Sequence, residues 1–343
     1  MKLSICVPTY NRPQYLENCL NSILIAKKKE KFNFNFEVCV SDNGSKHNIK
    51  KIIKKYKKNL NLKFHRFSRN MGISVNFLKT IQMARGEFIW MLGSDDMIVP
   101  SAFKELNNIY KKNKDIDFVC INSFNLNKSY LDKFSHPFNT LKLPNKMDRF
   151  SKLKISRKLD FWELINPKIA WDFMLAMFLL MFKREMFCKN LNAFDYKKIK
   201  DKRWMSNQDN TFFYLKVFAN AFKSSTAFFC AKPLSVNMQG VREWTTLYYL
   251  VEIIRIPEIL DYYRSQGLGF FRYIYCKNFS LRNFTNYVIK ILLSGKKSRS
   301  HYVDFRKHIF SNLIFPNVYL SIIYFFIRKI KQILNLNEKY KTV

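Results

Sequence analysis

The first hundred residues alternate short apolar runs with amphipathic segments, and this alternation constrains the fold more than any other feature of the chain. The apolar runs, which predict buried strands, are Leu3–Val7, Phe36–Val40, Leu62–Phe67 and Glu87–Leu92. Between them, apolar residues recur every three or four positions and predict helices, the first beginning at Pro13. Strands that alternate with helices form parallel sheets with right-handed crossovers. We therefore predict an α/β fold with a mostly parallel, Rossmann-like sheet flanked by helices.

The second half of the chain is less regular. Helix and strand patterns continue, but a long polar segment separates them, and from about residue 240 the alternation gives way to a basic, aromatic, helix-like tail. We expect one α/β domain over residues 1–235, with a first half at 1–125 and a second half at 126–235. A helical C-terminal extension is expected over residues 236–343.

The formal net charge of +35 predicts a polyanionic neighbour: nucleic acid, an anionic membrane or a phosphate-bearing substrate. A codon bias that favours Lys, Asn, Ile and Phe together accounts for the excess as well. The seven cysteines lie singly, which argues against a zinc site and indicates a reducing compartment. The first residues lead into a strand rather than a signal peptide, and no apolar stretch reaches the ~20 residues that span a bilayer. The expected location is therefore cytoplasmic.

Polar clusters follow three of the predicted strands, at Pro8–Arg12, Asp42–Ser45 and Gly93–Asp96. Each cluster by itself is compatible with an ordinary turn or a helix cap. Because the carboxyl ends of parallel strands meet at one edge of a sheet, where such folds bind ligands, we expect the three clusters to converge.

The chemistry of the clusters suits a nucleotide. A strand that opens onto a helix at Pro8–Arg12 presents backbone N–H groups to phosphate. Asp42 can accept hydrogen bonds from a base or a ribose, and Gly44 permits a sharp turn. The adjacent carboxylates of Asp95 and Asp96 repel each other unless a cation lies between them, and oxygen ligands favour Mg²⁺ or Mn²⁺.

The order of these clusters, with Arg-Asn-Met-Gly near residue 70 between the second and the third, resembles the family 2 glycosyltransferases of the GT-A fold. The resemblance covers residues 1–125 well and 126–235 weakly, and the tail matches nothing recognisable. Within the family, the Leu-Gly-Ser-Asp-Asp variant and the Asn-Met-Gly-Ile-Ser-Val-Asn-Phe-Leu segment are most similar to the abequosyltransferase-like enzymes of bacterial O-antigen and surface polysaccharide assembly.

The resemblance implies a site for a nucleotide-sugar donor. The residues that it places around the donor are Pro8, Tyr10, Arg12, Asp42, Asn70, Gly72, Ser94 and Asp95. Asp95 and Asp96 stand at the motif that holds Mg²⁺ or Mn²⁺, written Asp-x-Asp in most members. Here Gly93 replaces the first carboxylate, which puts the coordination of the metal in doubt.

The resemblance also implies a carboxylate at the start of an acceptor-side helix, where the candidate is Asp209. A base of this kind takes the proton from the acceptor hydroxyl as it attacks the anomeric carbon. Asp195 and Asp201 are nearby rivals, and a simple capping role for Asp209 stays open. Arg242 and Trp244 faintly resemble the Gln-x-x-Arg-Trp motif of processive members, with one residue too many, and are weak candidates for contact with diphosphate or acceptor.

The expected function is therefore the transfer of a sugar from a nucleoside-diphosphate donor to a glycan or lipid-diphosphate-linked glycan. The resemblance implies inversion at the anomeric carbon, metal assistance and a place in the synthesis of O-antigen, lipooligosaccharide or capsule. Two alternatives are weaker. A nucleotidyltransferase needs a Gly-rich loop after its first strand, and a basic RNA-binding protein needs a recognisable RNA-binding signature. The sequence has neither, so nucleic acid is not an expected partner.

The tail suggests where the protein works. The segment Phe315–Ile333 is apolar and aromatic but interrupted by Arg328, Lys329 and Lys331, so it is too short and too charged to span a bilayer. It suits a membrane interface, with aromatic rings buried and cations near anionic headgroups. A helix docked on the protein is the alternative. We expect peripheral attachment to the inner face of the cytoplasmic membrane.

Overall fold

A computed structural model describes residues 2–293 and 299–333, except for the side chains of Glu243, Trp244 and Ile333. The chain divides into two compact units, Met1–Arg242 and Glu243–Val343. The division falls a few residues beyond the expected 235, because Ser235 lies inside a long strand that continues to Gln239.

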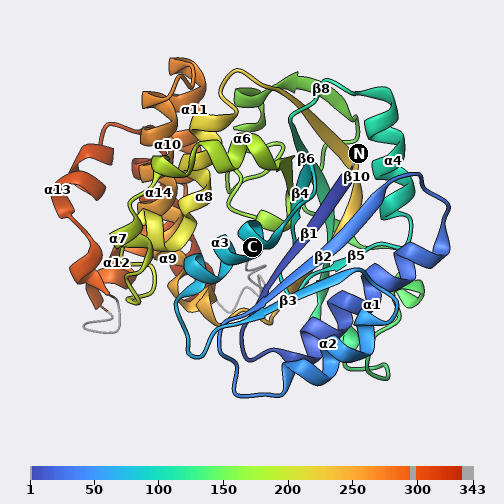
Figure 1. The fold of residues 1–343 in the computed structure, drawn as a ribbon. Helices are drawn as coiled ribbons and strands as arrows, with labels where there is room; N and C mark the ends of the chain where they lie inside the picture. The colour runs from blue at the N-terminus through green and yellow to red at the C-terminus, as the bar shows by residue number, and fades with distance from the viewer. Residues whose placement is uncertain (1, 294–298, 334–343) are drawn as a thin grey trace. The chain divides into compact units, whose positions relative to one another are not determined.

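The four strands expected in the first hundred residues are present: β1 (Lys2–Thr9), β2 (Asn35–Asp42), β3 (Leu62–Arg66) and β4 (Phe88–Met91). They pair in parallel in the order β3-β2-β1-β4 (Figure 1). The connecting helices are α1 (Pro13–Lys29), α2 (Ile49–Lys57) and α3 (Ile73–Met83). In this register Thr9 lies opposite Asp42, and Asp42 opposite Arg66. The carboxyl ends of β1, β2 and β3 are therefore level, which brings the loops that follow them together.

The sheet continues beyond β4 in the order β9-β6-β10-β5, and here it is mixed. Strand β9 (Leu180–Lys183) runs antiparallel between β4 and β6 (Phe118–Asn127), and β10 (Thr226–Gln239) runs parallel to β6 with irregular register around Pro233. The short strands β5 (Met97–Ile98), β7 (Asp148–Arg149) and β8 (Arg157–Asp160) pair antiparallel at the margins.

Helices cover both faces of this sheet. Helix α1 contacts α2 and α4 (Ala102–Lys112), whereas α3 and α6 (Arg184–Lys189) contact α8 (Gln208–Ala221) (Figure 1). Phe218 of α8 lies against Phe182 of β9 and Phe118 of β6, with ring centroids 4.9 and 5.0 Å apart. These buried rings fix α8 against the middle of the sheet. The remaining helical turns of this unit are α5 (Lys128–Leu131), α7 (Tyr196–Ile199), η1 (Thr140–Lys142), η2 (Phe161–Leu164), η3 (Met177–Leu179) and η4 (Leu191–Ala193).

The second unit is helical throughout its described residues, as expected for the C-terminal extension. Its elements are η5 (Glu243–Leu247), α9 (Tyr248–Leu250), the π-helical turn η6 (Val251–Arg255), α10 (Ile256–Ser265), α11 (Phe270–Ser280), α12 (Phe284–Leu293), η8 (Ser300–Tyr302), α13 (Phe305–His308), η9 (Phe310–Asn312) and α14 (Pro316–Ile333). Buried ion pairs hold it, including Glu252 with Arg282 at 3.0 Å and Glu258 with Arg255 at 2.5 Å.

Within the described residues no single helix has both the length and the apolarity to cross a membrane. A bent pair, Phe305–Asn312 and Pro316–Gln332, meets those two requirements only when its members are taken together across an 86° bend.

Candidate active site

The loops after β1 and β2 are joined by backbone and side-chain hydrogen bonds. Asn11 adopts the left-handed conformation (φ 53°), from which its N–H donates to Ser45 Oγ (2.7 Å) and its Oδ1 accepts from Lys46 N–H (2.8 Å). Two of the predicted donor-site residues stand beside this junction. Pro8 pairs with Ser41 in the sheet, and the side chain of Tyr10 is exposed just beyond the end of β1.

Asp42 ends β2 with its side chain fully buried. Ser45 N–H donates to its Oδ1 (3.0 Å), and Arg66 Nε lies 3.3 Å from its Oδ2. The turn depends on Gly44, which has φ +75° and packs so closely that a Cβ atom would come within 2.6 Å of the carbonyl carbon of Arg69. The Asp-x-Gly pattern predicted from the sequence thus brings the end of β2 against the loop around residue 70.

Asn43 holds that loop in place. Its Nδ2 donates to Asn70 Oδ1 (2.9 Å) and to the Gly72 carbonyl (3.2 Å), and its Oδ1 accepts from Met71 N–H (2.9 Å). The structure therefore brings Asn70 and Gly72 into contact with Asn43, the residue after Asp42. Sequence reasoning missed Asn43, although its position between Asp42 and Gly44 was the available signal.

The third cluster contains two carboxylates bound by arginines. Arg12 lies 3.1 Å from Asp95 Oδ2, so the end of β1 and the loop after β4 form one site. Arg242 Nε lies 3.3 Å from the same oxygen, and a terminal guanidinium nitrogen of Arg242 lies 3.2 Å from Asp96 Oδ1. Ser94, which precedes the pair, is buried in the turn.

Arg242 makes more contacts than its weak resemblance to the Gln-x-x-Arg-Trp motif predicted. Besides the two carboxylates, it donates to Asn237 Oδ1 (2.6 Å), and its guanidinium carbon lies 5.4 Å from the centroid of the Phe178 ring. All these partners belong to the first unit. The side chain of Trp244, the other weak candidate, lies outside the part of the chain that the structure describes.

Gly93 explains how the two carboxylates fit side by side. A Cβ atom at this position would lie 2.7 Å from Asp96 Oδ2 and 2.8 Å from Asp95 Oδ1. Both side chains are at least nine-tenths buried, and burial together with the charge of Asp95 raises the pKa of Asp96 to about 7. A glycine at position 93 therefore leaves the space that the Asp95 and Asp96 carboxylates occupy.

The carboxylate oxygens at this turn supply some, but not all, of the ligands that a hard divalent cation needs. Two adjacent carboxylates supply the oxygen ligands that Mg²⁺ and Mn²⁺ prefer, and a diphosphate can complete the shell. In residues 2–293 and 299–333, no group of three or more His, Cys, Asp or Glu side chains is placed to hold a metal ion unaided. The arginines on Asp95 and Asp96 supply the positive charge in the ligand-free protein.

Asp209 lies at the start of α8, where it was expected, and is 1% exposed. Its Oδ1 lies 2.6 Å from Lys216 Nζ, and its Oδ2 accepts from Asp195 N–H at 3.3 Å. No described contact joins it directly to Asp95 or Asp96. Its helix is linked to the donor loops indirectly. Ser74 Oγ donates to the Asn210 carbonyl (2.8 Å), and this hydrogen bond joins the start of α8 to the start of α3, which directly follows Gly72.

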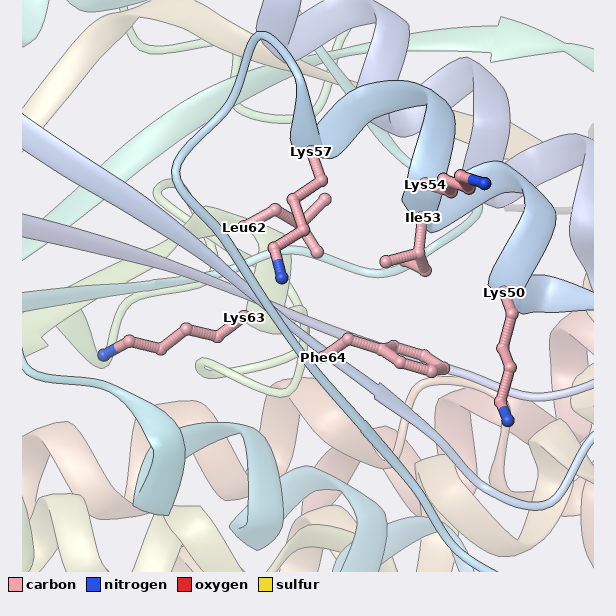
Figure 2. A pocket seen from close by; sticks show the side chains of 7 residues that line it. All are labelled: Lys50, Ile53, Lys54, Lys57, Leu62, Lys63 and Phe64. Atoms are coloured by element: carbon pink, nitrogen blue, oxygen red, sulfur yellow. The ribbon is translucent and has the colours of Figure 1, made fainter.

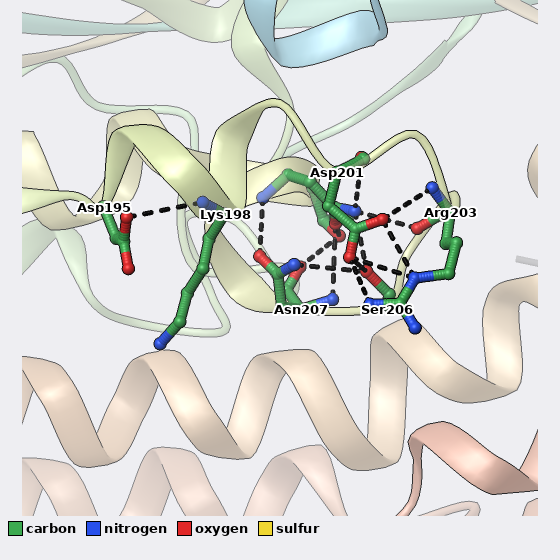
Figure 3. Close-up of polar contacts among 8 residues, drawn as sticks. Asp195, Lys198, Asp201, Arg203, Ser206 and Asn207 are labelled. Carbon is green, nitrogen blue, oxygen red and sulfur yellow. Dashed lines mark hydrogen bonds and ion pairs between the residues drawn. The ribbon is translucent and has the colours of Figure 1, made fainter.

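The two rivals of Asp209 have structural partners (Figure 3). Asp195 caps α7 by accepting from the N–H groups of Lys197 (2.7 Å) and Lys198 (3.4 Å), the second of which Figure 3 draws. Asp201 binds the Arg203 guanidinium and the Ser206 hydroxyl, and these contacts hold the pKa of its carboxyl well below the ordinary range. Both therefore serve to shape the loop that leads into α8.

Asp172 is a candidate that sequence reasoning did not identify. Its side chain is 5% exposed, and no described group donates a hydrogen bond to its Oδ1. Burial raises its pKa to about 7, against the opposing effects of backbone amides and of the positive charge of Arg242. The next two residues, Phe173 and Met174, both have left-handed backbones (φ 53° and 77°). An aspartate inside the apolar segment Trp171–Phe182 was the available signal.

A hollow elsewhere on the surface does not contain the predicted site residues. Lysines of α2 line it together with Leu62, Lys63 and Phe64 of β3 (Figure 2). The α2 lysines that line it, Lys50, Lys54 and Lys57, are exposed, as expected for the solvated face of an amphipathic helix.

The mixed sheet with ligand-type loops after β1, β2 and β4 is the architecture of a GT-A glycosyltransferase. Residues 4–177, half of the chain, match the family described as Glycosyl transferase family 2, and the protein belongs to that family. Its sequence is 38% identical over 122 residues to the abequosyltransferase RfbV of Salmonella typhimurium, a match that covers 35% of each chain. Over 106 residues it is 35% identical to the poly(ribitol-phosphate) beta-N-acetylglucosaminyltransferase TarS of Staphylococcus aureus, covering 31% of this chain and 18% of that protein.

Solved structures extend the similarity in fold beyond these segments. TarS residues 1–349 in complex with UDP-GlcNAc superpose with a TM-score of 0.57 at 18% identity, covering 88% of this chain and 78% of that one. The complex with UDP gives a TM-score of 0.55 at 20% identity, covering 83% and 72%. The sequence matches to RfbV and TarS span about a third or less of those relatives.

Proposed function

We propose that the protein transfers a sugar from a nucleoside-diphosphate donor to a glycan or lipid-linked glycan during synthesis of a bacterial surface polysaccharide. The observation that carries the proposal is the convergence of Arg12, Asp95, Asp96 and Arg242 in one ion-paired cluster. Related proteins named for sugar transfer, and structural neighbours that hold UDP or UDP-GlcNAc, support a nucleotide-sugar donor.

The donor end of the site follows from this arrangement. Asp42, fixed by Ser45 and Arg66, would accept hydrogen bonds from the base or the ribose. Asp95 and Asp96 would hold Mg²⁺ or Mn²⁺, which when bound neutralises charge on the departing diphosphate. Arg12 and Arg242 add fixed positive charge at the same point, where stabilisation of the leaving group lowers the barrier.

On the acceptor side, Asp209 takes the proton from the attacking hydroxyl. It pairs with Lys216 at 2.6 Å and stands in the first turn of α8, at the positive end of the helix dipole. Attack from the face opposite the leaving group inverts the anomeric carbon, as the family resemblance implies.

A binding and activity series tests the proposal. Nucleotides and nucleotide sugars are screened by thermal shift with Mg²⁺ or Mn²⁺, and transfer is then assayed with the donor that binds. Asp96→Asn and Asp209→Asn are each expected to lower kcat by about 10²–10⁴. Asp132→Asn, an exposed carboxylate far along the chain, serves as the control.

Absence of binding by every nucleoside diphosphate would overturn the proposal. Full turnover by Asp209→Asn would show that Asp209 is not the general base, and would leave the rest of the proposal standing.

The second unit supports attachment to a membrane. Seventeen of the 22 large apolar side chains exposed in the described residues belong to it, and its sequence carries 16 Lys or Arg against 6 Asp or Glu. Among the described side chains of α14, Val318 and Ser321 are buried, and three are partly covered: Asn317, Phe325 and Lys331. Most of the described apolar and aromatic side chains of this helix are therefore exposed. Exposed rings beside cations suit an anionic bilayer, and a lipid-linked acceptor would be presented at that surface.

A further inference from the structure

Asn43 joins three segments on the donor side of the first unit. It follows Asp42, the last residue of β2, and its backbone N–H donates to the carbonyl of Thr9, the last residue of β1 (3.0 Å). Its side chain is buried and contacts the loop of residues 70–72 that precedes α3. Asn43 therefore lies at the edge of the sheet where the strand ends and this loop meet.

Backbone groups determine which way the Asn43 amide faces. Its Oδ1 accepts from the Met71 N–H (2.9 Å), and its Nδ2 donates to the Gly72 carbonyl (3.2 Å). An N–H can only donate and a carbonyl can only accept, so a reversed amide would place donor against donor and acceptor against acceptor. The loop therefore holds Asn43 Nδ2 as the donor at this contact.

Asn43 determines in turn which way the Asn70 amide faces. Asn43 Nδ2 donates to Asn70 Oδ1 (2.9 Å), and the same oxygen accepts from the Gly72 N–H (2.9 Å). Two donors thus hold the oxygen, and the Nδ2 of Asn70 lies on the other side of its amide. The Asn70 side chain is exposed, and within residues 2–293 and 299–333 no protein group accepts a hydrogen bond from this nitrogen.

The orientation of the amide decides which ligand atoms Asn70 can bind. An amide nitrogen only donates, so it pairs with an acceptor oxygen. Phosphate oxygens are acceptors of this kind, and hydrogen bonds to a charged oxygen are stronger than those to a neutral one. Sugar hydroxyls also accept. In the reversed orientation, Asn70 Oδ1 would face the same ligand oxygens and repel them.

We propose that Asn43 is a positioning residue that keeps the Nδ2 hydrogens of Asn70 turned outward, where they donate to acceptor oxygens of the nucleotide-sugar donor. This role rests on the proposed function, because it needs such a donor at this edge of the sheet. Asn70 touches the donor directly, whereas Asn43 acts through Asn70. The diphosphate and the sugar hydroxyls are the two sources of such an oxygen.

Isothermal titration calorimetry on the full-length protein with Mg²⁺ tests this role. The probes are UDP, CDP, GDP and dTDP, together with the glucose ester of the nucleotide that binds. Asn70→Ala removes the outward donor and is expected to weaken binding about tenfold. Asn43→Ala keeps that donor but no longer orients it, so a loss of about threefold to tenfold is expected. Asn59→Ala, which changes an exposed asparagine of the same unit, should leave binding unchanged.

The double variant separates orientation of Asn70 from support of the loop. If Asn43 acts through Asn70, Asn43→Ala has no further effect on Kd once Asn70 is already Ala. If Asn43 only supports the loop, Asn43→Ala weakens binding equally in both backgrounds, and the inference is wrong. An unchanged Kd in Asn70→Ala would also overturn it.

Loss of folded protein is measured separately, because it lowers the number of binding sites in the titration and leaves their Kd unchanged. If Asn43→Ala does not fold, Asn43→Ser, a neutral side chain that also lacks the Nδ2 donor, replaces it in the same comparison.

The two kinds of probe identify the acceptor oxygen. An equal loss for the nucleotide and its glucose ester assigns the oxygen to the diphosphate, and a loss confined to the ester assigns it to a sugar hydroxyl. A protein that binds a nucleotide with the same affinity in every variant keeps the proposed function and loses this role for Asn43. A protein that binds none of the four nucleotides overturns the proposed function, and this role with it.

Discussion

Two buried carboxylates, Asp96 and Asp172, stand out at the scale of single residues. Asp96 and Asp172 both have pKa values raised to about 7 by burial, and Arg242 opposes the rise in each. Such groups destabilise the fold at neutral pH relative to a neutral side chain of the same shape. Their presence is easier to explain by binding than by packing.

Asp172 allows this cost to be measured. Its pKa is about 7 in the folded protein and 3.8 in an unfolded chain, so between these values the folded state binds more protons and its stability falls as pH rises. Asp172→Asn removes the titration, leaving Arg242, Tyr214 and Cys120 around a neutral amide. We expect the variant to exceed the wild type in stability at pH 8 by about 1–3 kcal/mol, and by less at pH 5.

Urea denaturation followed by tryptophan fluorescence at the two pH values measures the difference. An equal difference at pH 5 and pH 8 would contradict the raised pKa.

Gly44 and Gly240 show two different reasons why a position favours glycine: a backbone with positive φ, and a lack of space for a Cβ atom. Both have positive φ (+75° and +78°), but a Cβ atom on Gly44 would meet the backbone of Arg69 at 2.6 Å, whereas one on Gly240 meets nothing within 4 Å. Gly240→Ala should cost only the conformational strain, about 1 kcal/mol. Gly44→Ala adds a clash with backbone that cannot rotate away, so we expect about 3 kcal/mol or more. If the two variants lose equal stability on thermal unfolding, the backbone around Arg69 moves to accommodate the Cβ atom at little cost.

At the scale of elements, local patterns predicted the first half of the site well. The apolar runs and the polar clusters after them indicated the strands and the edge at which Arg12 and Asp95 meet. The antiparallel strand β9 between β4 and β6 was not predicted, because pairing between distant segments leaves no periodic trace in either one. Asp172 was missed for the same reason, because its burial and the electrostatic effect of Arg242 on it, from 70 positions away in the sequence, arise only in the folded chain.

Helix α8 offers a test at this scale, because its first turn carries Asp209. Asn207 Oδ1 accepts from Asn210 N–H (2.9 Å), and Asn210 Oδ1 accepts from Asn207 N–H (3.3 Å), closing a reciprocal cap. Asn207→Ala opens this cap and should cost about 1 kcal/mol, with a loss of transfer as Asp209 loses its fixed position. Asn207→Ser keeps a capping oxygen and should retain most of both.

Chemical denaturation and initial rates on the two variants measure these effects. If the alanine and serine variants behave alike, the cap does not position the base.

At the scale of the whole molecule, exposed apolar surface is distributed unequally between the two units. The first unit carries the candidate site, whereas most of the exposed aromatic and aliphatic side chains belong to the second. Of these, α14 combines a largely uncovered apolar surface with Arg328, Lys329 and Lys331 in its last turns. Membrane binding by such a helix has an electrostatic part that salt screens and an apolar part that salt does not weaken.

Vesicle flotation separates the two parts for the full-length protein. Binding to vesicles with anionic lipid should fall, but not vanish, between low and high salt. Replacing Arg328, Lys329 and Lys331 by Gln should remove mainly the salt-sensitive part, at about 1 kcal/mol per charge. Ile323→Ser with Phe326→Ser, both more than half exposed, should remove mainly the part that persists at high salt.

The matched control replaces three exposed lysines of the first unit, Lys111, Lys112 and Lys114, by Gln. If this variant loses as much binding as the α14 charge variant, the attraction reflects overall charge rather than α14. If Ile323→Ser with Phe326→Ser abolishes self-association in sedimentation experiments and leaves flotation intact, the apolar surface of α14 pairs with a second copy of the chain. Selective loss at α14 in both salt regimes is the outcome that places the donor site on a protein held at the bilayer, within reach of a lipid-linked acceptor.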